Sequence, residues 1–352
     1  MSRMADVLEN VAIDGWVKAF SRSPAQGNAP HESDAELIEV PGLPEHYLAI
    51  TIDTVSEEIL AGLYRDPYTM GWVAVMASLS DLAAVGADPL GLVISASVPT
   101  THGPEFAEQA GRGMEDACRS VGVFVLGGDS NAAPAVSLTG CAIGLVPRSA
   151  VLTRRNIRPG DALFLTGPAG GGNALALVRL AGLADDLFPE ARYRPSARLS
   201  AGAVLRGRAH ACMDTSDGVL TTLDQLMRLN GCGFEVECEW GRLLARDVLA
   251  LCERTGTPPW MMLAGPHGEF ELVFSAPAAD ADAIADDLRA AGLAPVRLGT
   301  VRDREAITLV LPGGRRADID MAPLRNLLET AGRDMRDYLS RFRDAGRRWG
   351  LE

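Results

Sequence analysis

The chain has 352 residues, of which 47% are hydrophobic and 22% charged, as in a globular protein too long for one typical core. Its net charge is −13, and it lacks a long Lys/Arg cluster, which excludes a typical nucleic-acid-binding surface. The nearest approach to such a cluster is Arg154-Arg155 with Arg158. We therefore expect two domains and no nucleic-acid partner.

The six cysteines include no CxxC pair, which argues against a zinc ribbon. The first residues lack a basic segment followed by an apolar stretch, so no signal peptide is expected. No apolar run reaches about 18 residues, the length that a membrane-spanning helix needs. These features predict a cytoplasmic protein with no membrane partner.

The first half of the chain alternates predicted strands and helices. An amphipathic helix is expected near the start, because apolar residues from Met4 to Phe20 recur at near-helical spacing. Strands are expected over 47–53, 90–98, 121–126 and 136–145, and helices over 71–85 and 104–120. Each of these strands ends near a glycine, a proline or an aspartate.

A turn at 158–161 precedes a new strand, so we place a domain boundary near residue 150. The expected units are an N-terminal domain over 1–150, a C-terminal domain over 151–320 and a helical extension over 321–352. In the second half, strands are expected over 162–166, 233–238, 270–276 and 295–301, and an amphipathic helix over 322–345. This order predicts an α+β pair of domains.

Short acidic residues stand out in four segments of the chain. These are Asp53-Thr54, Ser80-Asp81, the run from Gly127 to Ser130 (GGDS), and the run from Asp214 to Gly218 (DTSDG). Carboxylates at strand and helix ends can converge on Mg²⁺, which prefers a few carboxylates together with phosphate oxygens. Such a site suits phosphoryl transfer, where catalysis is mostly positioning and charge neutralisation.

Each segment also has a simpler interpretation. An aspartate or serine before a helix, such as Asp214 or Ser216, is often a helix cap, and Gly-Gly-Asp is often a turn. Asp81 differs, because it lies in an otherwise apolar helix where an unpaired carboxylate is costly.

Together the segments resemble the AIR synthase superfamily, and within it the thiamine-monophosphate kinase-like branch. Ile52-Asp53-Thr54 is similar to that family's TDT, residues 71–89 to its GWKALAVNLSDLAAMGAEP, and Gly127 to Ser130 to its GGDT. Residues 152–161 are similar to its LRRSGARPGD, and residues 214–219 to its DISDGL.

The resemblance implies a homodimer in which N-terminal sheets pair into a barrel, with ATP bound in a cleft between the two domains. It implies Mg²⁺ ligands at Asp34, Asp53, Asp81, Asp129 and Asp217. It also implies nucleotide contacts at Asp53, Thr54, Gly127, Gly128, Asp129, Ser130, Arg154 and Ser216. Of these positions, Asp217, Asp129 and Arg154 are the expected catalytic residues.

Some segments depart from the family pattern. Where the family has GDDAA, residues 32–36 read Glu-Ser-Asp-Ala-Glu, so Ser33 replaces the first acid. Residues 53–61 lack the histidine of the family's DTLVEGVHF, and residues 266–274 alter its GGEDYELLF. The substrate-side candidates are therefore Glu57, His267 and Glu269. The loop from Gly167 to Gly172 (GPAGGG) is either a phosphate cradle or a plain turn.

The leading hypothesis is an ATP- and Mg²⁺-dependent kinase that phosphorylates a small metabolite. That metabolite is either thiamine monophosphate or a different compound. Two alternatives stay open: an ATP-dependent cyclo-ligase or amide-activating enzyme of the same superfamily, and a catalytically silent nucleotide-binding relative.

Two other branches fit less well. Selenophosphate synthetase needs an early reactive cysteine, and the first here is Cys118; the hydrogenase-maturation branch ends in a cysteine, and this chain ends Gly350-Leu351-Glu352.

Overall fold

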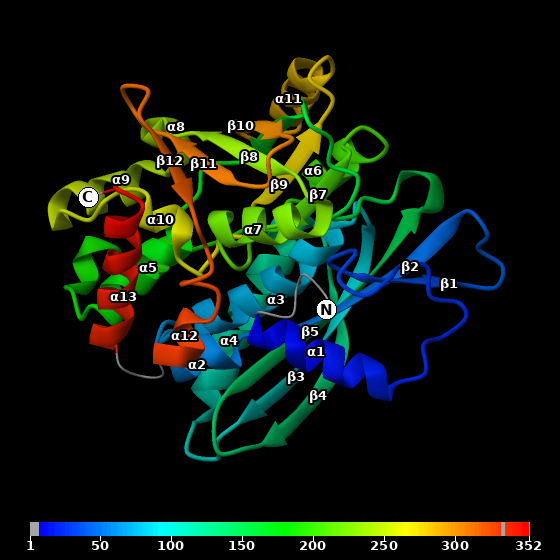
Figure 1. Ribbon diagram of the computed structural model, residues 1–352. Coiled ribbons are helices and arrows are strands. Elements are labelled where there is room, and N and C mark those ends of the chain that lie inside the picture. Colours follow the sequence, from blue (N-terminus) through cyan, green and yellow to red (C-terminus); the bar gives the residue numbers. More distant parts are fainter. Residues whose placement is uncertain (1–6, 332–334, 352) are drawn as a thin grey trace.

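Two β-sheets organise the protein, whose computed structural model describes residues 7–331 and 335–351. The N-terminal sheet has the strand order β1-β2-β5-β3-β4, and the C-terminal sheet has the order β12-β11-β8-β10-β6-β9-β7 (Figure 1). The strands are β1 Glu36–Glu39, β2 His46–Thr54, β3 Asp88–Val98, β4 Val125–Ala132, β5 Ser137–Pro147, β6 Ala162–Leu165, β7 Ala211–Asp214, β8 Gly233–Glu237, β9 Leu272–Ala276, β10 Val296–Arg302, β11 Ile307–Val310 and β12 Arg316–Ile319.

Helices connect and cover these strands. They are α1 Leu8–Ala19, α2 Ser56–Leu60, α3 Pro67–Ala84, α4 Pro104–Val121, α5 Gly171–Leu180, α6 Leu199–Leu205, α7 Val219–Asn230, α8 Trp240–Leu243, α9 Arg246–Thr255, α10 Met261–Ala264, α11 Ala281–Ala290, α12 Leu327–Ala331 and α13 Met335–Arg348. None of the helices in the described part of the chain combines the length and apolar character that crossing a membrane requires.

The N-terminal sheet packs one face on α3, and the described residues leave much of its other face exposed, as at Ile52 and Val93. Along β5, alternate residues are buried, as the two-residue period of a strand requires. The buried set includes Gly140, where a Cβ would lie 2.8 Å from the carbonyl oxygen of Ala74 on α3. A glycine here lets the helix approach the sheet closely.

The C-terminal sheet is covered on both faces. Phe164 and Phe274 pack with α6 and α11, whereas Leu163, Leu165 and Val273 pack with α5, α7 and α10. Residues of β6 and β9 are buried throughout, as expected of central strands covered on two sides. Most neighbouring strands are antiparallel, and β11 runs parallel to β8.

Helix α3 lies between the two sheets and touches both (Figure 1). It contacts β2, β5 and α4 in the N-terminal half, and α6 and β7 in the C-terminal half. Its side chains are buried on nearly every side, which explains the run of Ala, Val, Met and Leu in its sequence. Asp66 caps its start by accepting a hydrogen bond from the backbone N–H of Tyr68.

In the C-terminal segment, where the sequence analysis expected a helix over 322–345, the described residues are helical in α12 and in α13. Residues 332–334, between α12 and α13, lie outside the described residues. Helix α13 is held by aromatic contacts: the Trp260 ring stacks on Phe342 at 5.5 Å between centroids and meets Trp349 edge-on at 5.4 Å. These contacts fix α13 beside α5 and α10 (Figure 1).

The α+β fold prediction is confirmed, and the expected strands and helices of the first half are present with shifted ends. One expectation was wrong in detail: Gly127-Gly128-Asp129 lies inside β4 and does not follow it. Strands β1, β7, β11 and β12 were not predicted, because each has only four residues, too few for a period to stand out in the sequence. The boundaries near residues 150 and 320 stay predictions.

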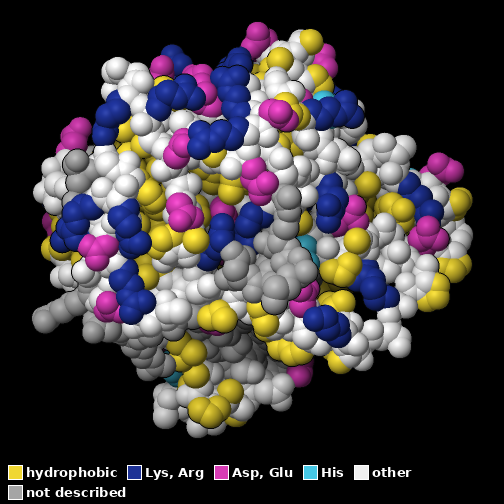
Figure 2. Space-filling view, in the orientation of Figure 1, with side chains coloured by type: hydrophobic (Ala, Val, Ile, Leu, Met, Phe, Trp, Pro, Cys, Tyr) yellow, Lys and Arg dark blue, Asp and Glu magenta, His cyan; other side chains and the backbone are white. Residues whose placement is uncertain are grey.

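Helix α1 forms where an amphipathic helix was expected, but the described part of the chain leaves several apolar side chains at the surface. Leu8, Val11, Trp16 and, just beyond the helix, Phe20 are exposed. Figure 2 shows hydrophobic side chains at the surface over this helix. Met4, included in the predicted pattern, lies outside the described residues.

Candidate functional site

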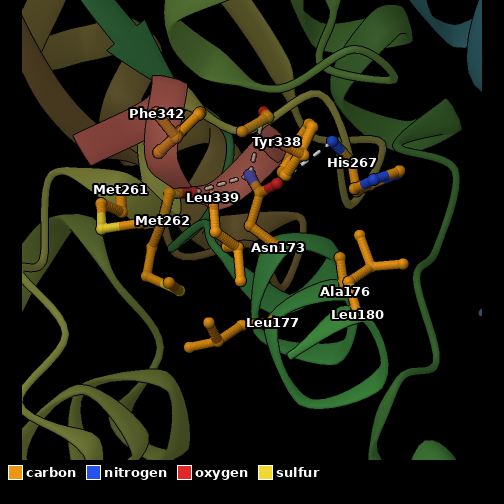
Figure 3. Close-up of a pocket in the computed structure, with 11 residues that line it drawn as sticks. Asn173, Ala176, Leu177, Leu180, Met261, Met262, His267, Tyr338, Leu339 and Phe342 are labelled. Atoms are coloured by element: carbon orange, nitrogen blue, oxygen red, sulfur yellow. Dashed lines mark hydrogen bonds between the residues drawn. The ribbon is translucent and has the colours of Figure 1, made fainter. Parts of the chain in front are cut away.

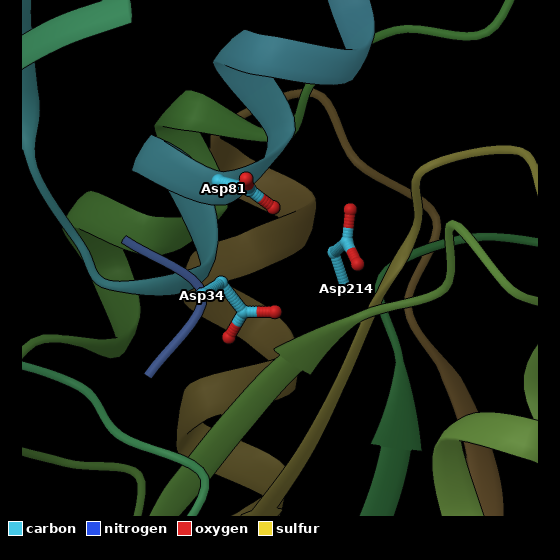
Figure 4. A group of neighbouring side chains, drawn as sticks. All are labelled: Asp34, Asp81 and Asp214. Atoms are coloured by element: carbon cyan, nitrogen blue, oxygen red, sulfur yellow. The ribbon is translucent and has the colours of Figure 1, made fainter. Parts of the chain in front are cut away.

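Three carboxylates converge where the two halves of the chain meet. One oxygen each of Asp34, Asp81 and Asp214 lies within 4.8 Å of the others (Figure 4). Asp34 comes from the loop before β1, Asp81 from the C-terminal part of α3, and Asp214 from the end of β7. The cluster therefore depends on the packing of α3 against both sheets.

Each of the three carboxylates is oriented by neighbouring polar groups. The guanidinium Nη2 of Arg154 donates to Asp34 at 2.9 Å, and the hydroxyl of Thr51 on β2 donates to Asp81. The hydroxyl of Ser80 donates to Asp214 at 2.7 Å across the two halves. These bonds fix the carboxylates in place before any ligand arrives.

Asp53 joins this group from β2. Thr51 and Asp53 are two residues apart on one strand and so face the same side, toward α3. The Asp81 side chain and the negative charges of Asp217 and Asp34 all influence the pKa of Asp53, so Asp53 belongs to the same acidic group. The side chain of Asp217 accepts a hydrogen bond from Gln225 at 3.3 Å.

The gathered negative charge shows in the pKa values. Burial raises the pKa of Asp214 to about 7, and the Asp34 charge adds to this rise. Burial raises the pKa of Asp81 well above its usual range, with further contributions from Asp53, Asp214 and Asp34. Burial also raises the pKa of Asp53. Without a cation, these groups cannot all be ionised at low cost.

The cluster fits a divalent cation. Asp34 Oδ2 and Asp53 Oδ2 are buried and have no hydrogen-bond partner among the residues that the structure describes, and the Asp34 side chain is only 1% exposed. Buried oxygens of this kind are costly unless something satisfies them. Hard cations such as Mg²⁺ take carboxylate oxygens as ligands. A bound cation would satisfy the orphaned oxygens and offset the repulsion at the same time.

Arg154 lies beside this acidic group. Burial acts to lower its pKa, but the charge and hydrogen bond of Asp34 outweigh burial and raise it, so the guanidinium is positive at any physiological pH. Its Nε has no hydrogen-bond partner and is buried. The residue thus has donor capacity left for a further anionic group.

Asp129 lies elsewhere in the chain. In the sheet register Asp129 lies opposite Ser95, Ser95 lies opposite Thr139, and Thr139 lies opposite Thr54. Three strand spacings separate Asp129 from Thr54, roughly 14 Å. Asp129 is exposed and accepts a hydrogen bond from Asn131. Within one chain the structure does not bring Asp129 to the cluster, nor its neighbours Gly127, Gly128 and Ser130 on β4.

Two other predicted nucleotide contacts have different surroundings. The Thr54 hydroxyl lies 2.7 Å from that of Ser56, which lies 2.6 Å from that of Ser137, in a partly exposed group of hydroxyls. The Ser216 hydroxyl donates to Asp214 Oδ1 at 2.8 Å, so it orients a cluster member directly.

The predicted substrate-side residues divide into one exposed side chain and two buried ones. Glu57 on α2 is exposed, whereas its neighbour Glu58 is turned inward, with Oε2 buried and unpaired. Burial lowers the pKa of His267 to about 4, so its imidazole is neutral at pH 7. Burial raises the pKa of Glu269 to about 8.

Glu269 occupies the glycine-rich loop that was considered as a phosphate cradle. Its Oε2 accepts a hydrogen bond from the Gly170 backbone N–H at 2.7 Å, and the N–H groups of Gly171 and Gly172 also point to it. The N-terminus of α5 could hold a phosphate or another external anion, but its N–H groups are already bound to the Glu269 carboxylate. In this conformation the loop is therefore not free to hold a phosphate.

His267 lines an apolar hollow beside this loop (Figure 3). Asn173 on α5 anchors the wall, because its amide donates to the carbonyl oxygens of Met262 and Gly265 and its oxygen accepts from the His267 N–H. Side chains of α5, α10 and α13 complete the lining. The aspartate cluster does not border this hollow.

Sequence reasoning missed the part that Asp214 takes in the site, and it singled out Glu57 where Glu58 is the glutamate turned inward. Asp214 was weighed mainly as a helix cap, yet it ends the fully buried strand β7, and that position at a strand end was the available signal. For Glu58, the choice between two adjacent glutamates depended on the phase of the short helix α2. Nothing in the sequence of residues 56–60 settles that phase.

Comparison with known proteins agrees with this geometry. The model of the AIR synthase related protein N-terminal domain matches residues 32–146, and that of the C-terminal domain matches residues 158–312. The chain belongs to the AIR synthase related family. The resemblance inferred from the sequence is thereby confirmed.

The similar proteins point to one branch of the family. The chain is 36% identical over 234 residues to the thiamine-monophosphate kinase of Halobacterium salinarum, covering 65% of this chain and 76% of that protein. It is 30% identical over 257 residues to the Escherichia coli enzyme of the same name, covering 69% and 75%. A solved structure described as AaThiL complexed with AMPPCP and TMP shares the fold, with a TM-score of 0.71, 21% identity and coverage of 88% and 94%.

Proposed function

We propose that this protein is an ATP- and Mg²⁺-dependent phosphotransferase that phosphorylates a small metabolite, as its thiamine-monophosphate kinase relatives do. The observation that carries the proposal is the convergence of Asp34, Asp81 and Asp214 around buried, unpaired carboxylate oxygens. The names of the relatives that share this chain's sequence supply the reaction class. The aspartate cluster supplies the chemical means.

Mg²⁺ would be held by Asp34, Asp81 and Asp214, with Asp53 and Asp217 close enough to influence the same group. When bound, the cation supplies charge neutralisation for nucleotide phosphates. The protein's own part is to place carboxylates, through Thr51 and Ser80, and to keep the group buried. Prepositioned groups of this kind reduce the reorganisation needed during reaction.

Arg154 would bind a phosphate oxygen with the donor atoms that Asp34 does not use, which fits its predicted catalytic role. The roles predicted for Asp217, Asp129, Thr54, Gly127, Gly128, Ser130 and Ser216 stay part of the proposal. For the β4 residues, the proposal needs a second copy of the chain or a bound nucleotide that reaches across the sheet.

The substitution at Ser33 does not remove a member of the carboxylate cluster. The Ser33 hydroxyl donates to the Ala35 carbonyl at 2.8 Å and accepts from the Asn28 amide at 2.9 Å. Its role is therefore to shape the loop that presents Asp34. This favours an active metal site over the catalytically silent alternative.

The test is phosphoryl transfer from ATP to thiamine monophosphate, with thiamine diphosphate and ADP measured by chromatography. Asp81→Asn and Asp214→Asn are expected to lower kcat roughly 100-fold or more, because each removes a charge that the cation requires. Asp303→Asn, which changes an exposed aspartate, is the matched control. Undiminished turnover in both cluster variants would show that the carboxylates do not act in the reaction.

Product analysis separates the alternatives. A kinase transfers phosphate to the acceptor, whereas a cyclo-ligase releases inorganic phosphate while it closes a ring or forms an amide. Mg·ATP binding in calorimetry without turnover of thiamine monophosphate or related phosphorylated alcohols would favour the silent alternative.

The predicted cytoplasmic location is consistent with six free cysteines.

A homodimer is the proposed assembly. The face of the N-terminal sheet that α3 does not cover carries Ile52, Cys141 and Val93 level with one another on adjacent strands. Ile52 is 68% exposed and Val93 36% exposed. A contiguous apolar sheet face of this kind is typical of a protein interface, and a second copy of the same face would cover it.

A further inference from the structure

The Asp214 carboxylate is held by hydrogen bonds from two elements. The Ser80 hydroxyl on α3 donates to Asp214 Oδ2 at 2.7 Å. The Ser216 hydroxyl donates to Asp214 Oδ1 at 2.8 Å, and the Ser216 backbone N–H donates to the same oxygen at 3.3 Å. Ser80 is buried in a long helix, whereas Ser216 is exposed in the turn between β7 and α7. Burial therefore does not fix the position of Ser216, and contacts of the turn with the rest of the protein must do so.

The metal-side turn, residues 215–218, packs against the backbone of the substrate-side segment, residues 265–271. The Gly268 N–H donates to the Ser216 carbonyl oxygen at 2.9 Å, and the Thr215 N–H donates to the Glu271 carbonyl oxygen at 2.8 Å. A Cβ on Gly268 would lie only 1.5 Å from the Thr215 carbonyl oxygen, far below van der Waals contact. The turn and the segment are therefore in direct backbone contact, which a glycine at position 268 permits.

Gly268 is also held at its carbonyl group, by Tyr193. The Tyr193 hydroxyl donates to the Gly268 carbonyl oxygen at 2.7 Å. Tyr193 is 4% exposed, and its ring stacks on that of Tyr64 with 5.9 Å between the centroids. Burial raises the pKa of Tyr193 well above its usual value, so the hydroxyl keeps its proton and can donate. Burial and stacking together leave the Tyr193 side chain little freedom to turn away from Gly268.

Asn173 is another side chain that anchors the substrate-side segment. It donates to the Gly265 carbonyl oxygen and accepts from the His267 N–H on the side of the apolar hollow (Figure 3). Among the described residues, Tyr193 is the one whose side chain bonds to Gly268. Removal of the Tyr193 hydroxyl would deprive the buried Gly268 carbonyl of this partner, which favours a shift of the segment. Such a shift would carry the Gly268 N–H away from the metal-side turn.

These hydrogen bonds connect Tyr193 to the metal cluster. Tyr193 donates to Gly268, and Gly268 donates to Ser216. The Ser216 hydroxyl then donates to Asp214. We propose that Tyr193 is a positioning residue that fixes the orientation of the Asp214 carboxylate for Mg²⁺. Groups that orient a metal ligand commonly control the affinity for the metal without touching it. This inference rests on the proposed function, since Asp214 belongs to its metal site.

The experiment compares Tyr193→Phe with Tyr68→Phe, because each substitution removes one hydroxyl and keeps the ring. The Tyr68 hydroxyl donates to Asp116 on α4 at 2.9 Å and has no bond to the metal-side turn. Mn²⁺, which takes the same oxygen ligands as Mg²⁺, is titrated into the nucleotide-free protein, and the free ion is measured by electron paramagnetic resonance. We expect Tyr193→Phe to weaken Mn²⁺ binding roughly 3-fold or more, and Ser216→Ala roughly 10-fold. Tyr68→Phe should leave it unchanged.

The double variant shows whether Tyr193 acts through Ser216. If it does, adding Tyr193→Phe to Ser216→Ala should weaken Mn²⁺ binding by less than roughly 1.5-fold, because the connection is already broken. Three results would overturn the proposal: effects of the two substitutions that multiply, equal Mn²⁺ affinity of Tyr193→Phe and Tyr68→Phe, or no Mn²⁺ binding by the wild-type protein. A lower melting temperature of Tyr193→Phe with unchanged Mn²⁺ affinity would make its role purely structural and also overturn it. The proposed function fails separately, through absence of phosphoryl transfer by the wild-type protein.

Discussion

The Asp81 side chain leaves an otherwise apolar helix and meets other carboxylates, and the Arg154 guanidinium in this group is hydrogen-bonded to Asp34. It accepts a hydrogen bond from Thr51, is repelled by the charge of Asp53, and lies within reach of Asp34 and Asp214. A hydrophobic residue at this position would pack with less cost. The retention of a charge here is therefore best explained by ligand binding, at the expense of stability in the ligand-free protein.

This cost should appear as a pH dependence. The pKa of Asp214 rises from 3.8 to about 7 and that of Asp81 also rises, so the folded protein binds more protons than the unfolded chain. The contribution of such groups to the free energy of unfolding is fully present below about pH 4, and it is lost as the pH rises through the folded-state pKa. We expect the metal-free protein to lose stability between about pH 4 and pH 7, other groups being equal.

Replacing Asp81 tests whether charge repulsion among the carboxylates lowers the stability of the metal-free protein at high pH. In metal-free protein at pH 8, Asp81→Asn should raise the melting temperature by roughly 2–4 °C, because it removes one of the repelling charges. At pH 4 the difference should shrink, and Asp303→Asn should have no effect at either pH. Differential scanning calorimetry measures all three proteins. A lower melting temperature of Asp81→Asn at pH 8 would mean that the carboxylates do not repel one another in the folded state.

At the scale of elements, the site depends on how α3 is held against α4 and the sheets. The two helices approach closely at glycines: a Cβ on Gly113 of α4 would lie 2.0 Å from the Tyr68 carbonyl oxygen, and one on Gly71 of α3 would lie 2.0 Å from that of Ala110. Such distances are far below van der Waals contact. A side chain at either position must push α3 away from α4.

Gly113→Ala and Gly111→Ala make a matched pair on α4. Gly113→Ala should reduce the free energy of unfolding by roughly 1–3 kcal/mol, because its methyl group overlaps α3. Gly111 has nothing within 4 Å of the added Cβ, so Gly111→Ala should increase stability by roughly 0.5–1 kcal/mol. Urea denaturation measures both. Equal effects of the two substitutions would argue against the close approach of α3 and α4.

The helix that carries Asp81 could be predicted from the sequence, because a long apolar run with one acid is visible without a structure. The partners of Asp81 were harder to predict. Asp214 reaches it only through packing of α3 on β7, a contact between residues far apart in the chain. Asp129 was placed with the others by motif similarity, yet the sheet register sets it about 14 Å from Thr54. Local patterns predict elements, and tertiary packing decides which acids meet.

At the scale of the whole molecule, the uncovered face of the N-terminal sheet exposes apolar side chains that a single chain leaves in contact with solvent. Phe124, just before β4, is also 73% exposed, and Leu126, near the start of β4, is 57% exposed. By register, Asp129 and Thr54 are level on this sheet, outside the aspartate cluster. A second copy would bury the apolar residues and bring further polar groups to the edge of the sheet.

The substitution Val93→Glu tests this assembly, because it places a charge in the middle of the uncovered face. In light scattering after gel filtration, the wild-type protein should have the mass of two chains and Val93→Glu that of one, since burying an unpaired carboxylate in an apolar interface is costly. Leu43→Glu is the control: Leu43 is also exposed, at 40%, but lies in the loop between β1 and β2. A dimer that persists in Val93→Glu would place the contact elsewhere, with the exposed apolar side of α1 as the next surface to substitute.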